Sequence, residues 1–221
     1  MAHLSARTHV VLVLDETGSM QSIRDETVGG LREWLSGLKA DLPGETPVTI
    51  VQFNSKRIAR VIDGARLGDV TDDAFDRYQP NYTTPLYDAV GQTILETERR
   101  VSGDDGVIFT VMTDGYENAS QEFTAEQVRR LIERLKSAGW KFMFLGADID
   151  AYAASGRLGF AQSDSVSMDQ GRMRAAFSTS RRKAFDYDTV RREAGAREAA
   201  ERTGYTEQDR LNLGDDDRND G

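Results

Sequence analysis

The stretch Asp15-Glu16-Thr17-Gly18-Ser19 combines residue types that can hold a metal ion. It directly follows an apolar run at residues 10–14 that predicts a β-strand, so Asp15 is expected where this strand ends and the chain turns. Gly18 permits a tight turn, and two hydroxyl groups then lie on the same side as the carboxylate. Oxygen ligands of this kind suit Mg²⁺, Mn²⁺ or Ca²⁺ rather than zinc or copper. A site of this type needs partners elsewhere in the chain.

Two such partners follow other predicted elements. The apolar residues 107–112 predict a second strand, which ends at Thr113-Asp114-Gly115. The segment 81–85 reads as a loop containing Thr84 that leads into a helix. If the two strands are parallel neighbours, Asp15 and Asp114 emerge at the same carboxyl edge, where open α/β sheets bind their ligands.

Taken together, the three loops resemble the metal-ion-dependent adhesion site (MIDAS) of von Willebrand factor A domains. The resemblance covers roughly residues 8–168 and includes the order and spacing of the loops. The segment 146–159 is also similar to small bacterial and phage-borne A-domain proteins. The matching site residues are Asp15, Thr17, Ser19, Thr84 and Asp114.

The resemblance implies a role for each matched residue. Thr17, Ser19 and Thr84 would supply oxygen ligands, some of them directly. Asp15 and Asp114 would hold the ion directly or through water. One coordination position would face solvent and accept an Asp or Glu side chain from a partner protein. Because few carboxylates would touch the ion, it would stay electrophilic and gain from an external carboxylate. The family more often has serine at position 17, but threonine keeps the hydroxyl. The alternative is a degenerate site that binds nothing.

Other carboxylates are expected near this site. Glu16 adds one directly beside it, and we expect this group to alter the metal preference or to repel an acidic partner. Asp148 and Asp150 follow a predicted strand at residues 140–145 and should open on the same edge. Either could contact the ion or the partner, but capping of a helix at residues 151–154 is the favoured interpretation.

The pattern along the chain predicts a doubly wound α/β fold, with a mostly parallel sheet, helices on both faces and one antiparallel edge strand. Residues 23–42 carry apolar side chains at helical spacing, and Gly29-Gly30 within them indicates close packing against the sheet. Residues 48–53 form the next strand. A hairpin turn at residues 54–56 then leads to the antiparallel edge strand at residues 57–62.

Further helices are expected later in the chain. One follows Thr84, and another begins at a capping box formed by Thr124 and Gln127 and closes at Gly139. Alternation of strands and helices favours a parallel, right-handed arrangement.

We divide the chain into an A-type domain at residues 1–168 and a helical extension with an acidic tail at residues 169–221. Residues 172–192 interleave basic and aromatic side chains, which could contact RNA or DNA. The same stretch could be a surface helix that packs apolar side chains such as Phe177 on the domain. From Ala194 onward polar and acidic residues dominate, and we expect a solvated or flexible tail.

Composition favours a cytoplasmic protein. The 221-residue chain contains no cysteine, so no disulfide framework or thiolate metal site is possible. We expect no signal peptide and no membrane contact, because residues 1–5 are polar and no apolar run approaches the length of a span. The formal net charge of −9 argues against a general nucleic-acid binder.

The predicted function is cation-dependent recognition of another protein, without enzymatic activity. The strongest enzymatic alternative is a Mg²⁺-dependent phosphotransferase resembling the haloacid dehalogenase type, with Asp15 as nucleophile. Position 17 lacks the usual acid/base Asp, and no Lys ends a predicted strand near the site. Neither histidine, His3 or His9, lies where a general base is needed, and no phosphate-cradling Gly-rich run occurs.

A third alternative is a structural or assembly component, for instance of a phage particle or a multiprotein complex, whose contacts do not need the ion. The long polar C-terminal extension motivates it. Some bacterial relatives act beside an AAA+ ATPase of the MoxR kind. This sequence has no ATPase motif, so such a role would require a separate partner chain.

Overall fold

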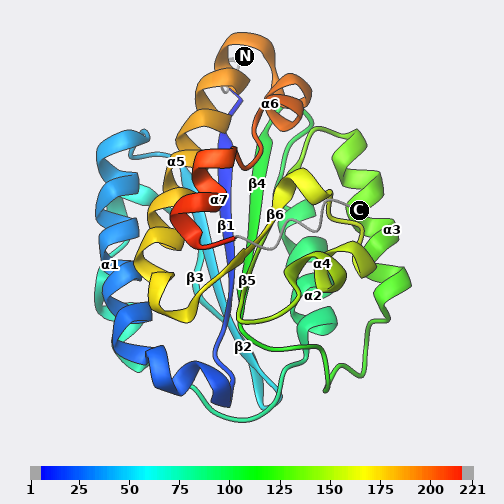
Figure 1. The fold of residues 1–221 in the computed structure, drawn as a ribbon. Helices are drawn as coiled ribbons and strands as arrows, with labels where there is room; N and C mark the ends of the chain where they lie inside the picture. The colour runs from blue at the N-terminus through cyan, green and yellow to red at the C-terminus, as the bar shows by residue number, and fades with distance from the viewer. Residues whose placement is uncertain (1–5, 216–221) are drawn as a thin grey trace.

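The computed structural model describes residues 6–215 and has a six-stranded sheet at its centre (Figure 1). The strand order is β3-β2-β1-β4-β5-β6. At one edge β3 is antiparallel to β2, and the remaining neighbours within the described residues pair in parallel. The strands are β1 (Thr8–Asp15), β2 (Pro47–Asn54), β3 (Arg57–Arg66), β4 (Gly106–Thr113), β5 (Lys141–Ala147) and β6 (Ser165–Met168).

Helices cover both faces of this sheet (Figure 1). One face carries α1 (Arg24–Asp41), α5 (Met173–Ala194), α6 (Ala196–Arg202) and α7 (Glu207–Leu213). The other face carries α2 (Leu86–Glu98), α3 (Ala125–Ser137) and α4 (Ala151–Arg157). The 3-10 segments are η1 (Gly18–Ile23), η2 (Leu67–Asp69), η3 (Asp72–Arg77), η4 (Gln162–Asp164) and η5 (Gln170–Arg172). No helix in residues 6–215 is both long enough and apolar enough to cross a bilayer.

The central strand β1 explains why a core forms on each face. All of its residues are buried, and successive side chains of a strand point to opposite faces. Val10, Leu12 and Leu14 pack in the core with α1 and α5, whereas Val11 and Val13 pack in the core with α2 and α3. A strand that is buried on both faces reads as a continuous apolar run, as this one does.

These elements confirm the predicted fold class, including the antiparallel edge strand. The capping box of α3 is also confirmed, because Thr124 Oγ1 accepts from the Gln127 N–H and Gln127 Oε1 accepts from the Thr124 N–H. The four-residue edge strand β6 was not predicted. It pairs in parallel with β5, so the sheet extends one strand further than the sequence pattern indicated.

Helix α5 is part of the core. Its apolar side chains, among them Phe177 at 1% exposure, pack with those of α1. Several of its basic residues form ion pairs within the protein: Arg174 with Glu33, and Arg181 with Asp41. The interpretation that residues 172–192 pack apolar side chains on the domain is therefore confirmed.

The expectation of a solvated tail from Ala194 onward is wrong for the described part of that segment. Helices α6 and α7 form within residues 196–202 and 207–213, and Leu213 is fully buried. Arg210 Nη1 and Asp215 Oδ2 form a buried ion pair at 2.9 Å. Long-range contacts therefore order a segment whose local composition looks disordered. The acidic run beyond residue 215 lies outside the described residues.

Close packing of α5 against α1 depends on Gly30. We expected Gly29-Gly30 to face the sheet, but the neighbouring element is α5. A Cβ on Gly30 would overlap the ring of Phe177, which has no space to move. A Cβ on Gly29 would instead meet the flexible end of the Arg174 side chain at 3.0 Å.

We expect Gly30→Ala to lower the free energy of unfolding by about 1–2 kcal/mol, because overpacking outweighs the better helix propensity of alanine. Gly29→Ala is the matched control, since it gains the propensity without the clash and should leave stability unchanged or raise it. Urea unfolding followed by circular dichroism measures both variants. Equal stability of the two would contradict the packing role of Gly30.

Candidate metal centre

Four of the five predicted ligands converge at the carboxyl edge of the sheet. Asp15 ends β1 and Asp114 directly follows β4. Because these two strands are parallel neighbours, both residues lie at the same end of the sheet. Ser19 Oγ donates a hydrogen bond to Asp114 Oδ1 at 2.6 Å, and the Thr17 N–H donates to Asp15 Oδ1 at 2.7 Å. Thr17 Oγ1 and Ser19 Oγ are 3.2 Å apart. The first loop thus ties the two strand ends together.

Thr84 reaches the same place beside Gly115. A Cβ built on Gly115 would lie 2.8 Å from Thr84 Oγ1 and 3.7 Å from Asp15 Oδ2. The Thr84 hydroxyl and the Asp15 carboxylate therefore flank the same glycine, which directly follows Asp114. The structure brings all five sequence-predicted residues together, and a side chain at position 115 would disturb them.

The Asp15 carboxylate is buried among neutral donors. Thr113 Oγ1 donates to its Oδ2 at 2.5 Å, and the Tyr78 hydroxyl donates to the Asp15 backbone carbonyl at 2.7 Å. Burial raises the pKa of Asp15 to about 7, against the opposing effect of the hydrogen bonds from Thr113 and Thr17. The nearby Asp114 carboxylate adds to the rise. Burial therefore disfavours the ionised form of Asp15, and a nearby positive charge would favour it.

The two later aspartates differ in role. Asp150 Oδ1 accepts from the Ala153 N–H at 2.8 Å and caps α4, which confirms the capping interpretation for this residue. Asp148 lies close enough to Asp114 to affect it: burial raises the pKa of Asp114, and the Asp148 carboxylate adds to that rise. The hydrogen bond from Ser19 opposes it.

Backbone hydrogen bonds fix the first loop against residues 78–82. The Gly18 N–H donates to the Tyr82 carbonyl at 3.0 Å, and the Asn81 N–H donates to the Glu16 carbonyl at 3.0 Å. We expected Gly18 to permit a tight turn, but it is not among the glycines with positive φ. A Cβ on Gly18 would lie 3.4 Å from the Tyr82 carbonyl oxygen, so close approach of two backbones accounts for this glycine.

Three side chains that the sequence did not identify hold the second and third loops together. Asn118 Oδ1 accepts from the Thr84 N–H at 2.8 Å, and Glu117 Oε2 accepts from a first-turn N–H of α2 at 2.9 Å. The Asp88 carboxylate accepts from the three N–H groups of residues 121–123 at 2.8–2.9 Å. Asp88 in the first turn of a helix was a usable signal. The other two become visible only when the loops meet in space.

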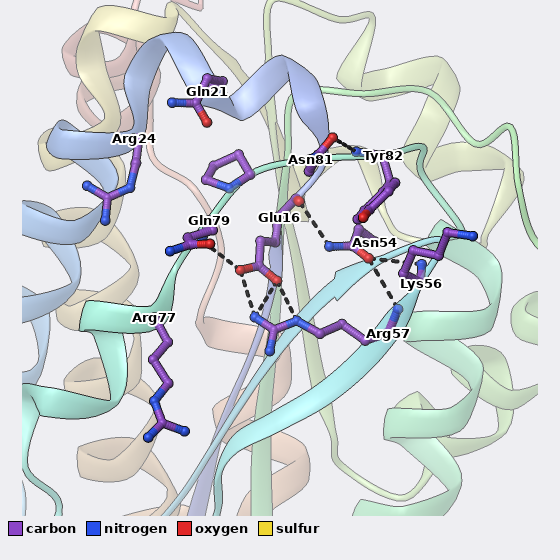
Figure 2. A pocket seen from close by; sticks show the side chains of 11 residues that line it. Glu16, Gln21, Arg24, Asn54, Lys56, Arg57, Arg77, Gln79, Asn81 and Tyr82 are labelled. Carbon is purple, nitrogen blue, oxygen red and sulfur yellow. Dashed lines mark hydrogen bonds and ion pairs between the residues drawn. The ribbon is translucent and has the colours of Figure 1, made fainter.

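The Glu16 side chain points toward Arg57 and Gln79, whereas we expected it to lie beside the ion site and modify it (Figure 2). Its side chain is 1% exposed and forms a two-pronged ion pair with Arg57, at 2.8 Å from Nη2 and 3.0 Å from Nε. The Gln79 N–H also donates to it at 2.8 Å. Neighbouring residues of an extended segment point to opposite sides, so the inward direction of Asp15 and Thr17 turns Glu16 outward. The Arg57 guanidinium therefore offsets the negative charge of Glu16.

Two exposed tyrosines flank the site. Tyr82 is 51% exposed and Tyr116 is 54% exposed. Tyr82 and Asp148 are also the non-glycine residues with positive φ within residues 6–215, at 68° and 51°. Strained backbone gathers at binding sites, and exposed tyrosines supply contact area in protein interfaces. This edge therefore has the features of a recognition surface.

The five side chains offer two carboxylates and three hydroxyl oxygens. These are hard oxygen donors of the kind that Mg²⁺, Mn²⁺ and Ca²⁺ bind. Within residues 6–215 no group of three or more His, Cys, Asp and Glu side chains is arranged to hold an ion. An ion at this edge would therefore rely on hydroxyl oxygens beside the two carboxylates.

No protein-family model matches the sequence, and no curated protein matches it significantly. Solved structures do share its fold. The vWF domain of the type V pili tip protein Mfa5 from Porphyromonas gingivalis is 11% identical with a TM-score of 0.61, over 81% of this chain and 95% of that chain. Proximal thread matrix protein 1 from the mussel byssus, solved with a zinc-occupied MIDAS motif, is 11% identical with a TM-score of 0.61.

A von Willebrand factor type A protein from Catenulispora acidiphila is 13% identical with a TM-score of 0.53, over 82% of this chain. The chain spans 48% of the length of the mussel protein and 43% of the Catenulispora protein. Together with the sheet order and helix layers, these likenesses show that the chain has the von Willebrand factor A fold.

The buried Asp15 carboxylate predicts how the stability of the ion-free protein depends on pH. Its folded-state pKa of about 7 lies above its unfolded value, so the folded state binds this proton more tightly. The resulting stabilisation is present below about pH 4 and is lost as the pH rises to about 7. We expect Asp15 to lower the free energy of unfolding by about 2–3 kcal/mol between pH 5 and pH 8 in chelator.

The Asp15→Asn side chain cannot ionise, so this variant should not show the decline in unfolding free energy between pH 5 and pH 8. The control variant Asp104→Asn changes an exposed residue and should keep the decline. Urea unfolding at pH 5 and pH 8 measures all three proteins. The same pH dependence in wild type and Asp15→Asn would show that the folded protein does not hold the Asp15 proton.

Proposed function

We propose that this protein recognises another protein through a divalent cation held by Asp15, Thr17, Ser19, Thr84 and Asp114. The hydroxyls would bind the ion, some of them directly, and the carboxylates would hold it directly or through water. A partner Asp or Glu would fill the remaining coordination position. The observation that carries the proposal is the convergence of these five side chains around Gly115, with Asp15 buried among neutral donors.

The chemistry of the donors favours Mg²⁺, with Mn²⁺ or Ca²⁺ as alternatives, because hydroxyl and carboxylate oxygens suit hard cations. The charge balance favours an acidic partner. Two carboxylates shared with three neutral hydroxyls leave the ion electrophilic, so it gains from one further carboxylate. The exposed Tyr82 and Tyr116 would add contact area around that bond.

The proposal contains no catalytic step. A phosphotransferase of the kind considered above needs a second acid near Asp15 and a lysine at the phosphate. Position 17 carries a threonine, and Lys141 lies at the start of β5, where its Nζ is 2.5 Å from Asp164. Burial lowers the pKa of Lys141, and the Asp164 carboxylate opposes this effect. Lys141 therefore has a structural partner at the opposite edge of the sheet.

The structural neighbours include pilus and byssus proteins, which supports a partner within a protein assembly. They give no support to a MoxR-type ATPase as that partner. A cytoplasmic location stays a prediction from the cysteine-free composition, since some of these neighbours are pilus proteins. An assembly role that needs no ion is the second candidate, and the neighbours that are pilus proteins favour it.

Calorimetric titration with Mg²⁺ and Mn²⁺ tests the ion. We expect one ion per chain in the wild type and none in Asp114→Ala. Gly115→Ala should weaken binding by about tenfold or more, because its Cβ would press on the Thr84 hydroxyl (about 1.4 kcal/mol per tenfold). Asp104→Ala is the matched control for loss of one carboxylate far from the site.

The proposal is wrong if none of Mg²⁺, Mn²⁺ and Ca²⁺ binds, whether or not an acidic peptide is present. Partner contacts that persist in chelator and in Asp114→Ala would favour the assembly role instead.

A further inference from the structure

A cleft of about 550 Å³ opens beside Glu16, which lies between two of the candidate ligands in the sequence (Figure 2). It is lined by side chains from the first loop, the β2–β3 turn and the segment that precedes Thr84. This volume is within the range of cavities that hold small ligands or side chains of a partner. The cleft does not contain any of the five candidate ligands, so it is a separate place on the same edge.

The lining of the cleft is strongly basic. Arg24, Lys56, Arg57 and Arg77 all border it, whereas Glu16 is its one acidic residue. This is notable in a chain with a formal net charge of −9. Figure 2 shows Arg24 and Arg77 on one side, Lys56 on the other, and the Glu16–Arg57 pair between them.

Part of this positive charge is not neutralised within the described residues. Glu16 forms an ion pair with Arg57, and Arg24 forms one with the exposed Asp25 at 2.9 Å. Lys56 lies over the Tyr82 ring, with Nζ 5.7 Å from its centroid, and the ion pairs among residues 6–215 do not include it or Arg77. Both side chains belong to exposed residues, so an incoming anion can reach them.

The cleft and the candidate ion site share their walls. Asp15 and Thr17 face the ion site, while Glu16 between them faces the cleft. The Gly18 N–H bonds to the Tyr82 carbonyl, so the same two segments border both places. One extended backbone separates the two places, because Glu16 lies between Asp15 and Thr17 in the sequence. A partner segment that crosses it advances about 3.3 Å per extended residue, so residues a few positions apart would reach the two places.

We propose that this cleft binds a second carboxylate of the same partner segment, one to three residues away from the carboxylate that reaches the ion. The inference rests on the proposed function and adds a recognition rule to it: the partner carries a pair of acidic residues rather than one. Charge complementarity carries the argument, because exposed unpaired cations at a concave site attract an anion and exclude a basic segment.

The test uses ¹⁵N-labelled full-length protein and three synthetic capped hexapeptides, each titrated in Mg²⁺ and in chelator. One peptide contains a single Glu, the second contains two Glu separated by two Gly, and the third replaces the second Glu with Lys. Amide chemical shifts detect millimolar binding and locate it. We expect the two-Glu peptide to bind about two- to fivefold more tightly than the one-Glu peptide, and the Lys peptide to bind more weakly.

The double variant Lys56→Ala/Arg77→Ala should remove the advantage of the second Glu and leave one-Glu binding within about twofold. Arg66→Ala/Arg99→Ala is the matched control, because it removes the same charge from exposed residues at the opposite edge of the sheet. It should leave both affinities unchanged. Shifts at residues 79–82 that appear only with the two-Glu peptide would place the second carboxylate in the cleft.

The outcomes separate this inference from the proposed function. Ion-dependent binding of the one-Glu peptide with no gain from the second Glu would keep the function and overturn the cleft. A gain from the second Glu that persists in chelator and needs Lys56 and Arg77 would keep the cleft and count against the ion. Inorganic phosphate that shifts residues 79–82 at low millimolar concentration, with no gain from the second Glu, would replace the carboxylate by a phosphate. No binding of any peptide would overturn both.

Discussion

The constraint on which the site depends is the burial of a carboxylate at the end of the central strand. Removing ionised Asp15 from water is unfavourable unless hydrogen bonds or an opposite charge compensate. The chain supplies the Thr17 N–H and the Thr113 hydroxyl, which are neutral, and the pKa of Asp15 stays near 7. The surrounding loops hold these donors and the other oxygens in place, yet they leave the charge itself uncompensated. A bound cation would compensate the negative charge of the ionised Asp15 carboxylate.

Two adjacent carboxylates are stabilised in opposite ways. Asp15 is held by neutral donors at the candidate ion site, whereas Glu16 is neutralised by Arg57 on the other side of the same backbone. One extended segment therefore separates the candidate ion site from the basic cleft. An acidic partner would meet favourable charge on both sides of this segment once an ion is bound.

The sequence predicted what depends on local pattern. Apolar runs located β1 and β4, and parallel pairing then placed Asp15 and Asp114 together. It did not predict the direction of Glu16, because Arg57 is 41 positions away and the pairing is set by how two loops meet. It also missed the order of residues 196–213, where short polar helices are held by distant contacts such as Arg182 with Asp209. Long-range electrostatic contacts leave no periodic trace in the sequence.

Packing of α5 against β1 and α1 has a consequence for the order of folding. Thr8 Oγ1 at the start of the first strand donates to Asp188 Oδ1, 180 positions later, at 2.8 Å. During synthesis from the N-terminus, one apolar face of β1 and the matching face of α1 emerge long before the helix that covers them. This face must stay exposed, or be shielded by a chaperone, until α5 leaves the ribosome. A chain that ends before residue 173 would therefore carry a sheet with one apolar face not yet covered by α5.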